Sequence, residues 1–263
     1  MKLRDLIGTE CMKLRRSKVT WISLAAYLVI GLFVGLMLWI VGHPGTAERL
    51  GLLGQKVSFA SSGVSADWKG LLALFAEMGG VGGMILYSIV VSYVFGREYA
   101  EGTAKNMLGL PLKRGLFVAA KLAVSSLWFL ALTLALIAES LASGALLGLS
   151  GFSWPLFLRE AGNVLVAALL SLALGPTVAW IAVASEGYLA PLGFTIFSLV
   201  LGTAFGATAW ARWVPWSIVP LFSGLAGPRV EELGPGSYLV MAAFFALTAL
   251  GASARFSRAD NTQ

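Results

Sequence analysis

The stretch FGREYAEGTAKNMLGLPLKRG, residues 95–115, lies between two long apolar runs, at 72–96 and 117–140. Six of its 21 residues are charged, whereas the whole chain is 58% hydrophobic and 12% charged. Soluble domains carry about 25% charged residues, so this composition indicates an integral membrane protein. The polarity of the chain is therefore concentrated between two candidate membrane spans.

The apolar runs predict the fold class. A helix needs about 20 apolar residues to cross about 30 Å of hydrocarbon. The alternation that marks a membrane β-barrel is absent from the sequence. We predict an all-α membrane protein with a single transmembrane domain over residues 1–263. Its six expected spans lie at about 20–41, 72–96, 117–140, 162–184, 188–209 and 237–254.

The basic residues predict the topology, because Lys and Arg concentrate on the cytoplasmic side of membrane proteins. With a cytoplasmic N-terminus and six spans, 13 of the 19 basic residues fall in cytoplasmic segments. We therefore expect both termini, and residues 97–121, in the cytoplasm of a multi-pass cell-membrane protein. The net charge of +6 is distributed as expected for contact with lipid, and nucleic acid is not an expected partner.

Three further segments carry structural signals. Residues 1–18 have apolar positions at helical spacing and predict an amphipathic helix in the headgroup layer, or alternatively a solvated basic tail. Residues 210–230 are apolar but contain three prolines, which predicts short re-entrant or interfacial helices after the fifth span. Four Gly-x-x-x-Gly motifs allow close helix approach without identifying a dimer face. These motifs begin at Gly31, Gly79, Gly144 and Gly202.

The sequence excludes several kinds of chemistry. No phosphate-binding G-x-x-x-x-G-K-[ST] motif is present, so the chain itself is not expected to hold a nucleotide or to be an enzyme. One cysteine, Cys11, and one histidine, His43, exclude an internal disulfide, cysteine-based metal clusters and most metal or nucleophile–base sites. Neither a catalytic site nor a cofactor or metal site is predicted.

Two acids fall within predicted spans, where carboxylates are costly and often functional. Glu139 lies near the outer end of the third apolar run, 117–140, and we consider it a possible pathway residue or, alternatively, a residue at the headgroup level. Glu77 lies near the outer start of the second span, and we interpret it as a residue at the headgroup level.

The segment REYAEGTAKNMLGLPLKRGLFVAAKL, residues 97–122, resembles the cytoplasmic segment between spans two and three of ABC-2-type transporter permeases. The ordered set that carries the resemblance is Glu98, Gly102, Thr103, Leu108, Pro111, Arg114 and Lys121. TECMKLRRSKVTW, residues 9–21, resembles the N-terminal entry of the family, with Glu10, Lys13 and Arg16 before the first span.

This resemblance implies a short coupling helix that docks on a separate ATP-binding subunit. Gly102 and Thr103 would start the helix and Pro111 would end it. Apolar anchors and a polar rim would make the contact, whereas the alternative is a solvated loop that only sets topology. The expected coupling residues are Arg97, Glu98, Glu101, Gly102, Thr103, Met107, Leu108, Pro111 and Arg114. Glu98 is expected to cap this helix or to pair with a basic group on the N-terminal helix, such as Arg15 or Arg16.

The resemblance also implies a working complex of two permease chains, identical or mixed, and two ATPase chains that hold ATP and Mg²⁺. We expect export of a hydrophobic or amphipathic substrate, such as a drug, an antimicrobial peptide or a lipid. Two alternatives stay open. One is a mechanical transmitter that acts on an outer partner without moving a solute, and the other is a six-helix channel or scaffold without an ATPase.

Overall fold

The computed structural model describes residues 3–51, 64–102, 114–225 and 233–258, and within these ranges the chain is helical without β-strands. Six helical segments in the described residues are long and apolar enough to cross a membrane, which confirms the predicted all-α membrane fold. They are α2 (Lys18–Gly42), α4 (Trp68–Ala100), α6 (Arg114–Leu146), α7 with α8 (Trp154–Leu172 and Gly175–Ala184), α9 (Leu189–Gly206) and α11 (Pro235–Arg258).

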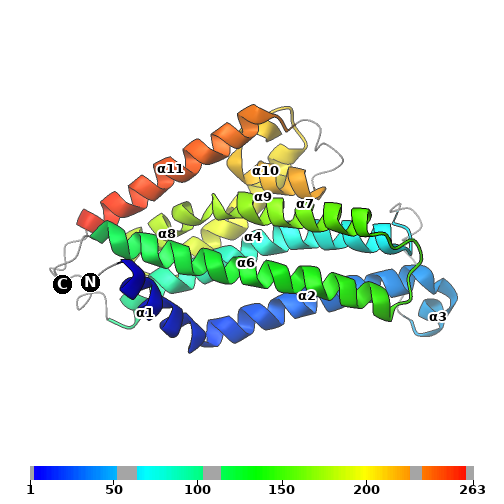
Figure 1. Cartoon of the computed structure of the whole chain (residues 1–263). Helices are drawn as coiled ribbons and strands as arrows, with labels where there is room; N and C mark the ends of the chain where they lie inside the picture. Colours follow the sequence, from blue (N-terminus) through cyan, green and yellow to red (C-terminus); the bar gives the residue numbers. More distant parts are fainter. Residues whose placement is uncertain (1–2, 52–63, 103–113, 226–232, 259–263) are drawn as a thin grey trace.

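The helices form an elongated bundle (Figure 1). Helix α1 (Leu3–Arg15) and the last turns of α11 lie at one end, which we call the proximal end. The short helix α3 (Pro44–Arg49) and the connection between α6 and α7 lie at the other, distal end. The last turn of α4 and the first turn of α6 also lie at the proximal end, on the same side of the bundle as α1.

Helix α4 is the centre of the bundle. It contacts α2, α6, α7, α8, α9 and the short helix α10 (Pro215–Ser223). Its glycines permit this crowding, because a Cβ at Gly79 would meet Leu136 of α6 and one at Gly80 would meet Ser223. Small residues allow helix backbones to approach closely. The 79–83 glycine motif is thus used for packing inside the chain.

The other glycine motifs are also occupied by intrachain contacts. Gly31 lies against the carboxylate of Glu139, a Cβ at Gly144 would collide with Trp68, and one at Gly202 would collide with the backbone of Trp216. Each of the four motifs therefore has at least one glycine that packs against another helix of the same chain. Their presence in the sequence is explained without a dimer interface.

The predicted span 162–184 is built differently from the expectation of one continuous helix. Helix α7 ends at Leu172 and α8 begins at Gly175, with Pro176 in its first turn. Proline lacks the N–H that would continue the helix hydrogen bonds and its ring clashes with the preceding turn, so the helix is interrupted here. Together the two helices still form one candidate span from Trp154 to Ala184.

After α9 the chain forms two short helices, η2 (Ala211–Trp213) and α10. Helix α10 is buried by α9, α4 and α7, and its residues Ile218, Val219 and Leu221 are inaccessible to solvent. Pro220 lies inside this nine-residue helix, and Gly224, at φ 91°, ends it. Short helices were predicted in this region, and their position relative to the membrane remains a prediction.

Candidate functional site

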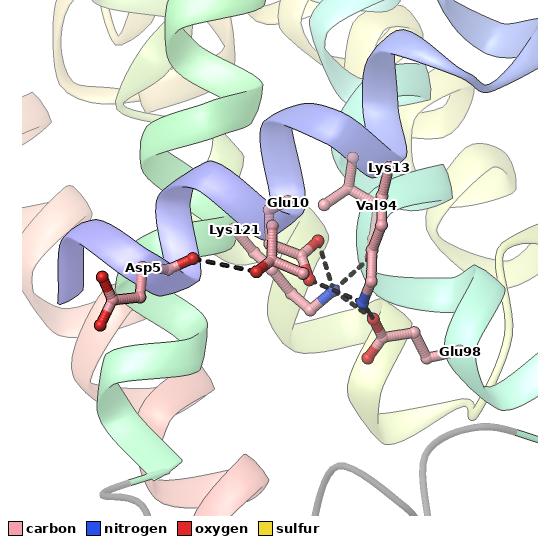
Figure 2. Close-up of polar contacts among 7 residues, drawn as sticks. Asp5, Glu10, Lys13, Val94, Glu98 and Lys121 are labelled. Carbon is pink, nitrogen blue, oxygen red and sulfur yellow. Dashed lines mark hydrogen bonds and ion pairs between the residues drawn. The ribbon is translucent and has the colours of Figure 1, made fainter. Parts of the chain in front are cut away.

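Two acidic and two basic side chains from three helices meet near the proximal end of the bundle (Figure 2). We call this group the ion cluster. Its members are Glu10 and Lys13 of α1, Glu98 of α4 and Lys121 of α6. Their formal charges cancel. The cluster links the N-terminal helix to the last turn of α4 and to the first turns of α6, the two helices on either side of residues 103–113.

Lys121 is the best-buried member, with 1% of its surface exposed. Its Nζ donates to Glu98 Oε1 at 2.8 Å, to Glu10 Oε2 at 3.1 Å and to the backbone carbonyl of Val94 at 3.0 Å. An ammonium group has three N–H donors, so each donor has an acceptor. This complete pairing permits a lysine within an otherwise apolar helix, where an unpaired charge would be very costly.

Lys13 bridges the same two carboxylates from the outer side of the cluster. Its Nζ lies 2.9 Å from Glu10 Oε1 and 3.1 Å from Glu98 Oε1, and its side chain is 34% exposed. Glu98 and Glu10 are only 4% and 6% exposed. Each buried carboxylate is therefore held by two lysines, one of which is buried and the other accessible to solvent.

The electrostatics of α1 follow from this arrangement. Burial by itself would raise the pKa of Glu10, but Lys121 and Lys13 outweigh it and hold the pKa below its ordinary value of 4.5. Burial would likewise lower the pKa of Lys13, but its contacts with Glu10 and Glu98 raise the pKa above its ordinary value of 10.5. Both groups are therefore charged across the physiological pH range.

Helical periodicity explains how each side chain reaches the cluster. Leu6, Glu10 and Leu14 recur every four residues on α1, and this buried face rests on α6. Lys13 follows Glu10 by three residues, so both side chains lie on neighbouring parts of the same face. On α4, the residue four positions before Glu98 is Val94, whose carbonyl Lys121 also contacts.

The predicted pairing of Glu98 with a basic group of the N-terminal helix agrees with the structure, although the residue differs from the two arginines named as examples. Glu98 does pair with the N-terminal helix, through Lys13 instead of Arg15 or Arg16. Both arginine side chains are exposed. The physical reason is rotation around α1: at about 100° per residue, Arg15 and Arg16 lie well away from the face formed by Leu6, Glu10 and Leu14.

The remaining predicted coupling residues are only partly described. Arg97 lies with its guanidinium 5.6 Å from the ring centre of Tyr93, and Glu101 is exposed. Gly102 has φ 67°, and its N–H bonds to the carbonyl of Tyr99, which ends α4 with a left-handed residue. Arg114 begins α6, although its side chain is not described. Thr103, Met107, Leu108 and Pro111, and with them the predicted coupling helix, lie outside the described residues.

Glu139 occupies a tight contact between α6 and α2. Its carboxylate fills the space that a side chain at Gly31 would need. The carboxylate oxygen Oε2 is buried and has no hydrogen-bond partner among the residues that the structure describes. Glu139 therefore faces another helix of the chain and not only lipid. Its role as a pathway residue stays a prediction.

Other chemistry is not supported by the geometry. In the described ranges, no three His, Cys, Asp or Glu side chains gather as a metal site would require. Cys11 is exposed on α1 and forms no disulfide. In the ion cluster, the two acids and two lysines are all paired with one another. Such a cluster is better suited to holding helices together than to acting as a catalytic acid or base.

Comparison with known proteins identifies the family. The model of the ABC-2 family transporter proteins matches residues 6–202, most of the chain. The chain belongs to the ABC-2 transporter family. Among curated proteins, the bacitracin transport permease protein BCRB of Bacillus licheniformis is 27% identical to this ABC-2 permease over 172 residues, which cover 65% of this chain and 81% of the relative.

The matched range of this ABC-2 permease contains all four residues of the ion cluster, whereas η2, α10 and α11 follow it. The sequence places Glu10, Lys13, Glu98 and Lys121 in two separate segments of the family resemblance, and the structure brings them together. What sequence reasoning missed is the central position of Lys121. The available signal is a lysine within an apolar run, which needs an acidic partner.

Proposed function

We propose that the chain is the membrane-spanning permease subunit of an ATP-driven ABC exporter. In this proposal a separate ATP-binding subunit holds ATP and Mg²⁺ and hydrolyses the nucleotide, and two permease chains form one pathway. The segment between α4 and α6 contacts the ATPase, and the permease itself carries no cofactor. Family membership supports the ATPase partner and the membrane setting.

The observation that carries the coupling mechanism is the ion cluster. It joins α1 to the last turn of α4 through Glu98 and to α6 through Lys121, both buried. A movement of the segment between these helices would therefore be transmitted to three elements as one unit. A buried, fully paired cluster resists separation, because removing one partner costs about 3–5 kcal/mol.

The polarity of residues 97–114 supports docking on a water-facing partner. The segment combines Arg97 and Arg114 with the acids Glu98 and Glu101, whereas topology alone would require only basic residues. Glu98 is used internally, so the exposed Glu101 and the basic residues are the groups that we assign to the polar rim. Both termini are then cytoplasmic, because α1 and the last turns of α11 lie at the same end of the bundle.

We propose a hydrophobic or amphipathic substrate. Few charged residues occur within the spans, and an apolar lining favours such cargo over a small ion. The relative is a bacitracin transport permease, which agrees with export of an amphipathic antimicrobial compound. Substrate would move only if its affinity differs between the conformations that ATP binding and hydrolysis select.

The test is reconstitution with the cognate ATP-binding subunit in lipid nanodiscs and in vesicles. The proposal requires that the two proteins co-purify, that the isolated permease neither binds nor hydrolyses ATP, and that amphipathic compounds stimulate hydrolysis by the complex. Glu98→Ala should assemble but lose this stimulation. Glu48→Ala removes an exposed acid at the distal end and is the control.

Nucleotide hydrolysis by the isolated chain would contradict the proposal that a separate ATP-binding subunit hydrolyses ATP. ATP hydrolysis without movement of any solute into vesicles would favour a mechanical transmitter. Ion conduction by the permease without its ATPase would favour a channel.

A further inference from the structure

A groove opens between α2 and α4 in their distal halves. Its volume is about 540 Å³, within the range of about 300–1,000 Å³ that is typical of small-molecule sites. The groove is lined mainly by apolar side chains of the two helices. Its lining includes Phe33, Met37 and Val41 of α2 and Leu74, Glu77 and Met78 of α4.

Among the described residues that line the groove, Glu77 is the one charged side chain and the others are apolar. Its side chain is half-buried, and it forms no ion pair or hydrogen bond with any of the residues that the structure describes. A carboxylate beside apolar walls gains most from a cationic ligand group, since burying an unpaired charge is unfavourable. Glu139 does not offer this, because its carboxylate is already packed onto Gly31.

The depth of Glu77 fits an amphiphile that enters from one leaflet. Glu77 precedes Glu98 on α4 by 21 residues, which corresponds to about 31 Å of helix. This is close to the thickness of the hydrocarbon core, about 30 Å. With the ion cluster at the proximal boundary of the membrane, Glu77 lies at the distal boundary, where a charged head and an apolar body can be accommodated together.

We propose that the groove binds a cationic amphiphile, with a protonated amine on Glu77 and an apolar body against Phe33, Met37 and Met78. This inference rests on the proposed function in one respect, because it takes the bound amphiphile to be transported cargo. A second groove of about 350 Å³ lies between α4, α6 and α11, and none of the described residues that line it is charged. It therefore offers no comparable selection of ligands by charge.

The direct test is binding to the full chain in phosphatidylcholine nanodiscs, whose lipids carry no primary amine. The probes are fluorescent derivatives of dodecylamine, dodecanol and dodecanoate with the same dye at the far end of the chain. We expect the amine to bind at least about tenfold more tightly than the alcohol, the size expected of a hydrogen bond to a charged group. The carboxylate should bind most weakly.

Three variants make the test specific. Glu77→Gln should abolish the preference for the amine and leave binding of the alcohol unchanged. Leu74→Trp fills the groove and should weaken both probes. Glu48→Gln, the same change of charge at an exposed distal position, should bind like the wild type. Equal affinity of the wild type for amine and alcohol, or an intact preference in Glu77→Gln, would overturn the proposal.

Two further measurements identify the occupant. Stimulation of ATP hydrolysis by the amine in the reconstituted complex, lost in Glu77→Gln, supports transported cargo, whereas competition by added phosphatidylethanolamine supports a lipid amine as the natural source. Efficient disulfide-linked dimers of Met37→Cys in a Cys11→Ser background would show that a second copy covers the groove, and would overturn ligand binding.

The two proposals fail separately. A complex that couples ATP hydrolysis to transport while the groove shows no preference for charge would retain the proposed function and reject the groove. A charge-selective groove in a chain that never associates with an ATPase would retain the groove and reject the proposed function.

Discussion

Lys121 of α6 donates a hydrogen bond of 2.8 Å to Glu98 of α4, and both side chains are almost completely buried. The pair joins the two helices that flank the proposed ATPase-docking segment. Glu10 and Lys13 complete the cluster from α1. The contribution of the ion cluster to stability, the dependence of that contribution on pH and the side of the membrane on which the cluster lies can each be measured.

Replacing Lys121 by methionine should have the largest effect in the cluster. The change leaves two buried carboxylates with only the partly exposed Lys13 as a common partner, and breaking a buried pair costs about 3–5 kcal/mol. We expect a clear loss of thermal stability in detergent and loss of substrate-stimulated ATP hydrolysis. Lys13→Met should cost less, because Lys121 still holds both carboxylates.

The matched control is Arg16→Ala. Arg16 is exposed directly after α1 and belongs to the same basic segment, so its loss should change stability by no more than about 1 kcal/mol. If Arg16→Ala destabilised the chain as much as Lys121→Met, basic charge in general would matter and not the specific pairing.

Glu98→Ala should insert normally and lose coupling. It removes an acceptor from Lys121 and from Lys13, which leaves Lys121 with Glu10 and the Val94 carbonyl. A double-mutant cycle between Glu98→Ala and Lys121→Met measures the interaction free energy of this pair. We expect at least about 1 kcal/mol, because the two residues are in contact. Full coupling of ATP hydrolysis to transport in Glu98→Ala would mean that the ion cluster does not transmit motion from the ATPase to the helices.

Docking of α1 should be independent of pH over the neutral range. The lowered pKa of Glu10 means that its contribution is complete above its ordinary value of 4.5 and is lost as the pH falls through the lowered pKa. The raised pKa of Lys13 means that its contribution is complete below 10.5 and is lost as the pH rises through the raised pKa. A fluorophore on Cys11, next to Glu10, should report an unchanged environment between these limits and a transition in stronger acid.

Glu10→Gln is the reference for this titration, because it removes the carboxylate of Glu10 from the ion cluster at every pH. The labelled variant should show the weakened docking already at neutral pH. A transition of the wild type near neutral pH would contradict the assignment of Glu10 and Lys13 as permanently charged partners.

Gly31→Ala should displace Glu139 and destabilise the contact between α2 and α6. A methyl group at this position would overlap the carboxylate of Glu139, although alanine otherwise favours a helix by about 1 kcal/mol over glycine. The double variant Gly31→Ala with Glu139→Ala should recover stability, since the shorter side chain frees the space. Gly162→Ala in α7, where an added Cβ meets no atom within 4 Å, should be neutral or slightly stabilising.

Native Cys11 provides a test of topology without a new cysteine. It is exposed on α1, so a membrane-impermeant maleimide should modify it only after intact cells are permeabilised. Ser150→Cys in a Cys11→Ser background lies exposed at the distal end and should react from outside. Reaction of Cys11 in intact cells would reverse the proposed orientation.

The sequence by itself determined the fold class, because membrane insertion depends on local properties. About 20 apolar residues suffice to span hydrocarbon, and each predicted run corresponds to one of the six candidate spans. The break at Gly175 and Pro176 was foreseeable in principle from proline chemistry, but not from hydrophobicity, which is continuous through it. The ordered motif at 97–121 also identified the family, later confirmed by the match over residues 6–202.

Only the tertiary structure decided which residues meet. Glu98 pairs with Lys13 and Lys121, and not with Arg15 or Arg16, because of the way α1 is rotated where it packs against α6. This packing brings together residues that are about 100 positions apart in the sequence. The same holds for Glu139 on Gly31 and for Glu77 in its groove. Apolar length is a property of a segment and can be read locally, whereas ion pairing in a membrane depends on the few ångströms that separate one helix face from another.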